Sequence, residues 1–320
     1  MNTLAKVVNI LIENQNKYIS GQKIAKMCGI SRVAVYKIIK KLLSEGYEIE
    51  RNKKIGYKLV FYPFIVEEFL KKNFKTVSKV YYFNQVTSTM DVAKELLQKN
   101  PQIQNTLIVA QKQTSGKGRL QRKWLSPEGG VYFSLILRPE VLPSEVFFLN
   151  YVFSLSVAEL LKEQYLINAT TKWPNDVVVD NKKICGILIE TDAEIDRVNW
   201  CIAGVGVNLN IKQTFFDKAK IDATSVMSLT GKKINPNHFF SELFKKIDFY
   251  YEMFLKKKYK ELTEKWSQFS STLGKDVEVI TPKEIVKGKA ICILPQTGAL
   301  IIKTSSGTKE ILSGDCIHLR

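Results

Sequence analysis

The 320-residue chain is poor in the two residue types that build most metal and redox sites. It contains five cysteines and two histidines, and no two cysteines have Cys-x-x-Cys spacing. An odd number of widely spaced cysteines predicts reduced, mostly buried thiols, and two histidines are too few for a histidine-built metal site. The sequence therefore predicts no disulfide framework, no structural zinc and no dedicated metal site.

Long apolar runs are also missing. No stretch approaches the roughly 18 consecutive apolar residues that a membrane span needs. Residues 1–19 carry Asn2, Lys6 and Asn9 among their apolar positions, a pattern typical of an amphipathic helix and not of a secretory signal. Internal repeats and low-complexity tracts are absent as well. We therefore expect a cytoplasmic protein with no membrane association.

Positive charge, in contrast, is abundant and unevenly distributed. The chain has 48 Lys or Arg against 31 Asp or Glu, a formal net charge of +17. Residues 1–60 alone hold twelve Lys or Arg and four Asp or Glu, which is nearly half of the excess. A strongly basic segment predicts an acidic partner for this end of the chain.

The pattern of this basic segment favours duplex DNA as the partner. Residues 20–27 fit a short helix, Gly29 fits a tight turn, and Ser31 is a good N-cap for a helix that runs to about Ser44. Two strands expected within 47–60 would form a basic hairpin, or wing. Residues 1–63 therefore predict a winged helix-turn-helix, with a solvated basic face on a small interaction domain as the alternative. The expected DNA contacts are Gln22, Ser31, Arg32, Tyr36, Lys37, Lys40, Lys53 and Lys54.

The remaining sequence predicts two further domains, which makes the chain an α+β multidomain protein. Strands and helices alternate in residues 64–270, which favours a central α/β domain with a mixed sheet. One long helical region is expected from about Pro236 to Ser270. Residues 271–320 contain four short strand candidates separated by proline and glycines, a spacing that fits a small β-barrel of the SH3 type. Either a structural or a catalytic role fits this last domain.

A basic glycine-rich motif in the central region indicates a site for anionic ligands. Residues 116–124 read Gly-Lys-Gly-Arg-Leu-Gln-Arg-Lys-Trp and place four cations beside two glycines that permit positive φ and close approach of a ligand. Because these cations repel one another, we expect a mobile loop that becomes ordered around an anion. The spacing excludes a P-loop, because Gly118 stands where that pattern needs Ser or Thr. A solvated basic turn is the alternative.

A second motif, Lys172-Trp173-Pro174-Asn175-Asp176, directly precedes three valines that predict a strand. Its polar groups should therefore lie at the mouth of that strand. The next strand begins near Lys183, whose ammonium can reach a cleft beside Asn175 and Asp176 or extend into solvent. The two motifs together suggest a site for a small anion and a nucleotide phosphate.

These motifs, in this order, resemble those of the biotin protein ligases. The shared pattern continues in Ser126-Pro127-x-Gly129, Ser134-Leu135-x-Leu137-Arg138-Pro139, Lys183-x-x-Gly186-Ile187-Leu188-x-Glu190 and Gly204-x-Gly206-x-Asn208. With the helix-turn-helix in front and the small barrel behind, the whole chain resembles the bifunctional BirA family, whose members ligate biotin and repress the biotin operon.

The resemblance implies a two-step acyl transfer. The biotin carboxylate attacks the α-phosphate of Mg-ATP, and biotinyl-5′-adenylate and pyrophosphate form. A lysine on the biotin carboxyl-carrier domain of acetyl-CoA carboxylase or pyruvate carboxylase then attacks the mixed anhydride. Both steps accumulate negative charge on phosphate oxygens, which fixed cations stabilise, and no covalent nucleophile is needed. The resemblance also implies biotin operator DNA as a partner and a homodimer promoted by biotinyl-5′-AMP.

The resemblance further implies residue roles by position. Lys183 and Arg119 are the expected catalytic residues. The expected biotin contacts are Ser88, Thr89, Met90, Gln113, Gly116, Lys117, Gly118, Arg119, Lys183, Gly186 and Gly204. The expected ATP and adenylate contacts are Arg122, Trp124, Lys172, Asn175, Asp176 and Asn208. Magnesium is expected to arrive with ATP and to lie near Asp176.

Two positions depart from the family pattern. Lys117 replaces an arginine, which keeps the charge but loses the bidentate fork, and Met90 replaces a common asparagine, so that only its backbone is a safe contact. Residues 223–225 offer no aromatic ring that could stack on adenine.

Two other functional classes remain open at this stage. A DNA-binding biotin sensor would show no ATP turnover, and the intact Asn175-Asp176 and Arg122-x-Trp124 patterns argue against it. A lipoate or octanoate transferase shares the central fold but lacks the glycine-and-arginine loop.

Overall fold

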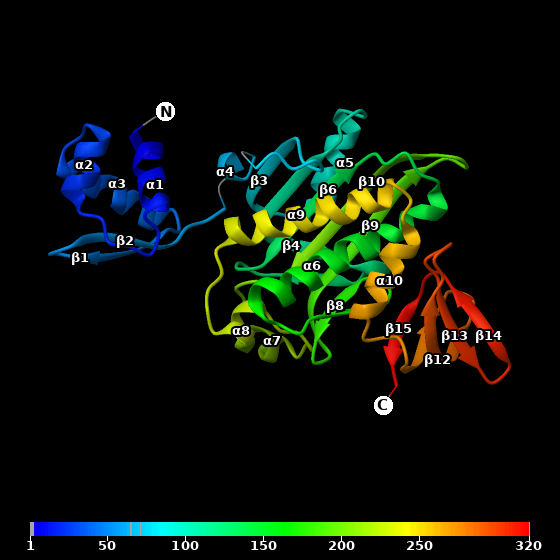
Figure 1. The fold of residues 1–320 in the computed structure, drawn as a ribbon. Coiled ribbons are helices and arrows are strands. Elements are labelled where there is room, and N and C mark those ends of the chain that lie inside the picture. Colours follow the sequence, from blue (N-terminus) through cyan, green and yellow to red (C-terminus); the bar gives the residue numbers. More distant parts are fainter. Residues whose placement is uncertain (1–2, 65, 71, 320) are drawn as a thin grey trace. The chain divides into compact units, whose positions relative to one another are not determined.

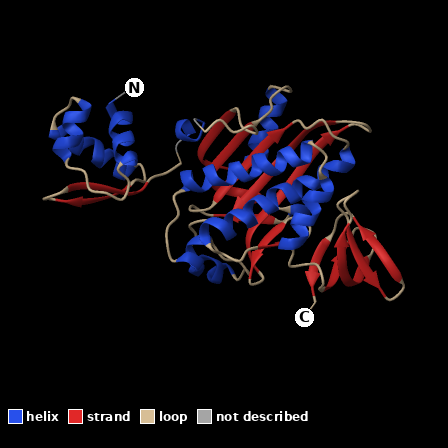
Figure 2. Ribbon diagram, in the orientation of Figure 1, coloured by secondary structure: helices blue, strands red, loops and turns tan. Residues whose placement is uncertain are grey.

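The computed structural model describes residues 3–64, 66–70 and 72–319. The chain divides into two compact units, Met1–Ile65 with Asn235–His238 and Val66–Ile234 with Phe239–Arg320. Figures 1 and 2 show helices and a hairpin in the first unit, and a large and a small sheet in the second.

The first unit contains the predicted helices and hairpin. Its elements are α1 (Thr3–Glu13), α2 (Gly21–Cys28), α3 (Arg32–Ser44), β1 (Glu48–Asn52) and β2 (Gly56–Phe61). The Ser20 hydroxyl accepts a hydrogen bond from the backbone N–H of Lys23, and Ser31 does the same for Ala34, each at 3.1 Å. Gly29 ends α2 in a left-handed conformation with φ of 66°. The predicted cap at Ser31 and the turn at Gly29 are thus confirmed, and Ser20 is a second cap that was not predicted.

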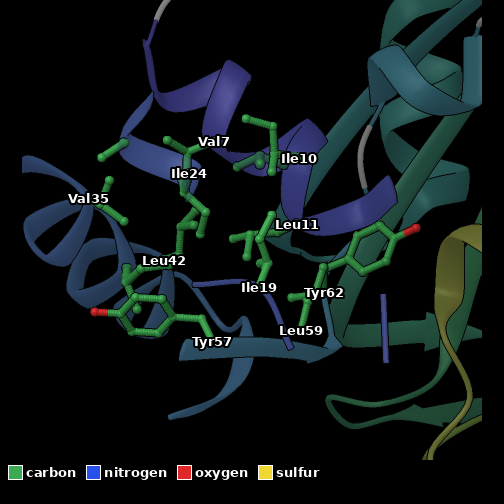
Figure 3. Packing of buried hydrophobic residues seen from close by; sticks show 13 residues of the cluster. Val7, Ile10, Leu11, Ile19, Ile24, Val35, Leu42, Tyr57, Leu59 and Tyr62 are labelled. Atoms are coloured by element: carbon green, nitrogen blue, oxygen red, sulfur yellow. The ribbon is translucent and has the colours of Figure 1, made fainter. Parts of the chain in front are cut away.

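The core of the first unit explains the orientation of α3. Val35, Ile39 and Leu42 are buried at helical spacing and pack with residues of α1, α2 and β2 (Figure 3). Lys37 and Lys40 lie on the exposed side of the same helix. The amphipathic pattern therefore points the basic side chains of α3 toward solvent.

The second unit begins with a mixed β-sheet and the helices that pack on it. Its elements up to residue 269 are α4 (Val66–Leu70), β3 (Lys79–Val86), α5 (Thr89–Lys99), β4 (Thr106–Lys117), η1 (Arg119–Gln121), β5 (Lys123–Ser126), β6 (Val131–Leu137), η2 (Pro143–Phe148), α6 (Leu149–Tyr165), β7 (Thr170–Lys172), β8 (Asp176–Val179), β9 (Lys182–Ala193), β10 (Val198–Val207), α7 (Gln213–Ala219), α8 (Val226–Thr230), α9 (Pro236–Leu255) and α10 (Tyr259–Phe269).

The strand order is β3-β4-β6-β10-β9-β8-β7, with β5 paired to β4. Strands β3 and β4 are parallel and the other pairs of this sheet are antiparallel. The predicted mixed sheet is confirmed.

Helices cover both faces of this sheet because alternate residues of a strand point to opposite sides. On one side Phe133 of β6 contacts Phe240 and Phe244 of α9, with ring centroids 5.8 and 5.5 Å apart. On the other side Ile136 of β6 packs with Met90 of α5. Figure 1 shows α6, α9 and α10 across the first face. The start of α5 is thereby held against the strands that carry the glycine motifs.

Several predicted boundaries differ from the structure. Strand β4 continues to Lys117 and includes the start of the basic motif, which we expected to be a loop. The long predicted helix from Pro236 is two helices, α9 and α10, separated at Lys257, whose φ is 54°. The sequence over 65–74 also predicts an amphipathic helix at the start of this domain. The structure has α4 at Val66–Leu70, and residues 65 and 71 lie outside the described residues.

Helix α6 and the turn η2 before it form a long apolar segment. In the part of the chain that the structure describes, the segment Pro143–Tyr165 is long and apolar enough to cross a membrane, but 78% of its most apolar window is buried in the protein. It contacts β7, β8, β9 and α10. Packing on several elements at once identifies α6 as a core helix.

The last residues form a separate antiparallel sheet. Its strands are β11 (Asp276–Ile280), β12 (Ile285–Ile293), β13 (Leu300–Thr304), β14 (Gly307–Ile311) and β15 (Asp315–His318). The order is β14-β13-β12-β11-β15. The four predicted strands are confirmed. Strand β14 was not predicted because its Thr308, Lys309 and Glu310 are polar and only Ile311 is buried.

Replacement of Leu42 by alanine should destabilise the first unit. Leu42 is 1% exposed and its neighbour Leu43 is 48% exposed, so the two leucines form a matched pair. We expect Leu42→Ala to lower the unfolding free energy of α1–α3 by about 2–5 kcal/mol and Leu43→Ala to change it by less than about 0.5 kcal/mol. Native-state hydrogen exchange of the amides in these helices measures both values. Equal losses in the two variants would contradict the core described above.

Candidate functional site

A cavity of about 420 Å³ lies in the second unit. It is bounded by the start of α5, the β4–β5 hairpin, the turn before β8, strands β9 and β10, and the ends of β11 and β15. Its lining residues are Ser88, Thr89, Met90, Gln113, Lys117, Gly118, Arg119, Arg122, Lys123, Trp124, Phe133, Lys172, Trp173, Pro174, Asn175, Asp176, Lys183, Gly186, Ile187, Leu188, Gly204, Val205, Gly206, Ile280, Asp315, Cys316 and Ile317. Both sequence motifs therefore meet at one cavity.

One end of the cavity is a network of neutral polar groups. The Gln113 Oε1 atom accepts hydrogen bonds from the Thr89 backbone N–H at 2.8 Å and from the Thr89 hydroxyl at 3.1 Å. Gln113 Nε2 donates to Ser126 Oγ at 2.9 Å, and the Ser134 hydroxyl donates to Thr89 Oγ1 at 2.8 Å. Ser88 caps α5 by accepting from the Met90 N–H. These mutual bonds hold the side chains in place before any ligand arrives.

The basic glycine motif folds as a hairpin and not as an open loop. Gly116 of β4 pairs with Trp124 of β5. Gly118 has a φ of −123°, and the φ of Gly116 is not positive either. The positive φ values of the motif are those of Leu120 and Gln121, 52° and 59°. The expectation that the two glycines adopt positive φ is therefore wrong. Close approach of the strands explains Gly116, because a Cβ there would lie 2.5 Å from the Trp124 carbonyl oxygen.

Lys183 places its ammonium inside the cavity. Its Nζ atom lies 2.7 Å from Asp176 Oδ1 and 5.1 Å from the centre of the Trp124 ring. The side chain is 35% exposed, so the charge is accessible from the cavity while it is partly shielded from bulk water. Of the two placements open at the sequence level, the structure has the one beside Asp176.

Two cations of the β4–β5 hairpin are also paired with carboxylates. Lys117 forms an ion pair with Asp91 of α5, and Arg122 forms one with Asp315 of β15. Asp315 is 193 residues from Arg122 in sequence, and nothing in the sequence indicated this contact. These carboxylates offset the repulsion that we expected to keep the hairpin mobile.

Arg119 is the hairpin cation with neutral partners. Its Nη1 atom donates to Asn175 Oδ1 and to the Gly314 carbonyl oxygen, both at 3.2 Å. Burial lowers the pKa of the Arg119 guanidinium, which still remains charged at neutral pH. Asn175 in turn donates through Nδ2 to the carbonyl of Ile187. Arg119 thus carries a charge that no carboxylate contacts in the described residues.

Glycines of β9 and β10 make room for the Trp124 ring. A Cβ on Gly206 would lie 2.5 Å from Trp124 Nε1, and one on Gly186 would lie 2.9 Å from Trp124 Cζ3. A Cβ on Gly204 would meet Met90 Sδ at 2.7 Å. Trp124 Nε1 is buried and has no hydrogen-bond partner among the described residues. The Trp124 indole thus gives the cavity an aromatic surface, and its Nε1–H is a hydrogen-bond donor without a partner among the described residues.

Most predicted ligand contacts line the cavity. The exceptions are Gly116, which lies in the hairpin behind it, and Asn208, which is buried and donates through Nδ2 to the Lys183 carbonyl at 3.3 Å. Sequence reasoning missed Gly206, although it stands in a quoted motif, and Asp315, Cys316 and Ile317, for which no local signal exists. Over residues 3–64, 66–70 and 72–319 no group of three metal-binding side chains occurs, and all five cysteines are free thiols.

The first unit presents the expected DNA contacts at its surface. The exposed residues are Gln22, Ser31, Arg32, Tyr36, Lys37, Lys40, Lys53 and Lys54. The Arg51 guanidinium of β1 lies 5.1 Å from the centre of the Tyr36 ring of α3. This contact joins the hairpin to the exposed side of α3, so both basic elements belong to one surface.

Three family models match the chain. They are an HTH domain at residues 3–58, the biotin/lipoate A/B protein ligase family at 82–208 and a biotin protein ligase C terminal domain at 272–319. The bifunctional ligase/repressor BirA of Bacillus subtilis is 34% identical over 98% of each chain. BirA of Escherichia coli is 24% identical over 100% of this chain and 98% of its own.

A solved structure has a similar fold over most of the chain. The biotin protein ligase from Aquifex aeolicus in complex with biotin and ATP is 33% identical, with a TM-score of 0.64, and the match covers 76% of this chain and 99% of that one. Since a relative more than 30% identical matches along almost the full length, the chain belongs to the BirA family of bifunctional ligase/repressors.

Proposed function

We propose that the chain is an ATP-dependent biotin protein ligase that also acts as a biotin-responsive repressor. It converts biotin and Mg-ATP to biotinyl-5′-adenylate and pyrophosphate, and then transfers biotin to a lysine of a carboxyl-carrier domain. The observation that carries the proposal is the meeting of Arg119, Arg122 and Lys183 in one cavity that also has a neutral polar end. A ligand with an uncharged ring system and an anionic tail fits such a cavity.

Biotin occupies the neutral end in this proposal. Its ureido ring needs donors and acceptors that are already in place, which the Ser88, Thr89 and Gln113 network supplies. Met90 and Gly204 form an adjoining apolar contact, which suits the thioether ring. Gly186 leaves the backbone of β9 open to the same ligand. Met90 acts through its position in α5 and its backbone, because its side chain has no strong hydrogen-bonding group.

The carboxylate of biotin then points toward the cations. Lys183 is the main contact of the carboxylate and of the α-phosphate, and Arg119 adds a second charge from the hairpin. Lys117 and Gly118 close over the acyl phosphate from the same hairpin. Cations fixed in a partly dry site stabilise the pentacovalent phosphorus and later the departing phosphate more strongly than water does. Attack by the carboxylate oxygen breaks the bond between the α- and β-phosphates and releases pyrophosphate.

The nucleotide lies along Trp124 and the turn before β8. Trp124 offers the aromatic face that residues 223–225 lack, with Nε1 free to donate to an acceptor. Arg122 and Lys172 face the triphosphate, and Asn175 and Asn208 hold the backbone around them. Magnesium arrives as part of the Mg-ATP substrate. The Asp176 carboxylate lines the cavity and is the hard oxygen donor that suits this ion.

The remaining parts of the proposal concern partners and domain organisation. The acceptor is the carboxyl-carrier domain of acetyl-CoA carboxylase or pyruvate carboxylase, and the free thiols fit a cytoplasmic protein. Residues 1–63 are a winged helix-turn-helix that binds the biotin operator as a homodimer promoted by biotinyl-5′-AMP. Residues 64–270 form the ligase domain, and residues 271–320 form a barrel of the SH3 type.

Loss of the Lys183 ammonium should abolish adenylate formation. We expect Lys183→Ala to reduce biotin-dependent exchange of pyrophosphate into ATP by at least about 10²-fold, because the charge on the phosphate loses its nearest cation. Lys182→Ala is the matched control, since Lys182 is exposed and does not line the cavity. Exchange at the wild-type rate in Lys183→Ala would remove this residue from its proposed role.

A methyl group at Gly206 and one at Gly204 should affect different substrates. Gly206→Ala pushes against the rigid indole of Trp124, so we expect the KM for ATP to rise by about tenfold with little change for biotin. Gly204→Ala pushes against Met90 and should weaken biotin binding instead. Steady-state kinetics of pyrophosphate exchange, with ATP and biotin varied in turn, test whether each variant affects only its own substrate. The same substrate affected in both variants would refute the assignment of the two ends.

The basic side chains of α3 should determine binding to operator DNA. We expect Lys37→Ala with Lys40→Ala to weaken duplex binding and to reduce the slope of log affinity against log salt by about two, because two phosphate contacts are lost. Lys41→Ala is the control, since Lys41 lies 3.7 Å from Glu45 in an ion pair on the same helix. Electrophoretic shifts at several salt concentrations, with biotin and ATP present, measure both slopes. An unchanged slope in the double variant would exclude α3 from the DNA contact.

A further inference from the structure

The segment between α10 and β11 runs beside the turn that carries Asn175 and Asp176. Ser270 forms a bridge with Thr171, and the Ser271 N–H donates to the Thr171 carbonyl at 2.8 Å. One residue further on, the Trp173 N–H donates to Thr272 Oγ1 at 3.0 Å. The linker to the last sheet therefore extends the edge of the central sheet and ends on the first residues of the Lys172–Asp176 motif.

His318 of β15 completes this junction. Its Nε2 atom lies 3.1 Å from Thr272 Oγ1, and Thr272 is fully buried. Thr272 Oγ1 already accepts a hydrogen bond from the Trp173 N–H. The Thr272 hydroxyl can therefore donate its proton to His318 Nε2. A neutral imidazole protonated on Nδ1 accepts that proton at Nε2, so the Thr272 hydroxyl both accepts from Trp173 and donates to His318.

The surroundings of His318 favour this neutral form. Burial and the positive charges of Lys172 and Lys275 lower the pKa of His318 to about 4. If Nε2 of His318 carried the proton, this N–H and the Trp173 N–H would both point at Thr272 Oγ1. The hydroxyl proton of Thr272 would then be buried without an acceptor. The bond from the Thr272 hydroxyl to His318 is thus the arrangement that the local charges support at neutral pH.

The junction leads directly to the cations of the cavity. Trp173 is 1% exposed and cannot move without displacing the residues after it. Asn175 accepts from Arg119, and Asp176 is the ion-pair partner of Lys183. On the other side of the junction, Cys316 and Ile317 of β15 line the same cavity. His318 therefore joins two walls of the site although it does not line the cavity itself.

We propose that His318 is a positioning residue for the nucleotide half of the site, acting through the Thr272 hydroxyl on the turn from Trp173 to Asp176. This inference rests on the proposed ligase function. In the absence of His318 the Thr272 hydroxyl loses the partner that orients it, so its oxygen holds the Trp173 N–H less firmly and Asn175 and Asp176 hold their cations less well. The neutral end, formed by Ser88, Thr89 and Gln113, has no contact with this junction, and its ligand should be unaffected.

The test uses substitutions that keep or remove one hydrogen-bonding atom in the full chain. His318→Gln retains an acceptor near the position of Nε2, whereas His318→Leu does not. Thr272→Ser keeps the hydroxyl, and Thr272→Val removes it. Thr308→Val is the matched control, because Thr308 lies in β14 of the same sheet and is exposed. Each variant is assayed by biotin-dependent pyrophosphate exchange, and its biotin affinity is measured by titration calorimetry.

We expect His318→Leu and Thr272→Val to raise the KM for ATP by about tenfold, with biotin affinity within about twofold of the wild type. His318→Gln, Thr272→Ser and Thr308→Val should stay within about threefold for both substrates. His318→Leu combined with Thr272→Val should be no worse than Thr272→Val alone, because both act in one chain of contacts.

Three outcomes would overturn the role of His318. They are wild-type kinetics in His318→Leu, equal losses in His318→Gln and His318→Leu, and a parallel loss of ATP and biotin binding, which indicates a general loss of structure. The wild-type chain is measured first. Absence of biotin-dependent exchange in it would refute the proposed ligase function, whereas normal exchange with an unaltered His318→Leu variant refutes the positioning role alone.

Discussion

The site depends on the ion pair between Lys183 and Asp176 under the ring of Trp124. A lysine ammonium in a partly dry cavity is unfavourable unless a carboxylate or an aromatic face compensates it, and here both do. The charge can therefore be kept in the folded protein before any ligand binds. In the proposed function an incoming carboxylate or phosphate meets a cation that is partly shielded from water and already oriented, so less reorganisation is left for the reaction.

The cavity exists because three strand positions have no side chain. Gly186, Gly204 and Gly206 lie on neighbouring strands, where any Cβ would collide with Trp124 or Met90. Strands normally avoid glycine because it packs poorly, and here that missing volume is used for the indole and for the ligand. The same hairpin that delivers Trp124 also delivers Arg119 and Arg122. Contact of this hairpin with Gly186 and Gly206 therefore supplies both the shape and the charge of the cavity.

Sequence reasoning succeeded where the signal was local. The N-cap at Ser31 and the buried face of α3 follow from spacing alone, and the structure has them. The cavity-lining residues near the two motifs were found through order and family resemblance. The conformation of the basic motif was predicted wrongly, because charge repulsion was considered without its partners. Asp91 and Asp315, which pair with Lys117 and Arg122, are distant in sequence and have no pattern of their own.

The last sheet shows why a distant segment can matter to a site without any recognisable motif. Its strand β15 is short, yet Asp315 pairs with Arg122, Ile317 lines the cavity and His318 bonds to Thr272. Alternate residues of a strand point to opposite sides, so one strand can contact the hairpin and the linker at once. The carboxylate of Asp315 pairs with Arg122, the cation that we propose as a contact of the triphosphate. In the proposed function a nucleotide therefore competes with Asp315 for this guanidinium, and the ion pair holds the Arg122 side chain at the cavity.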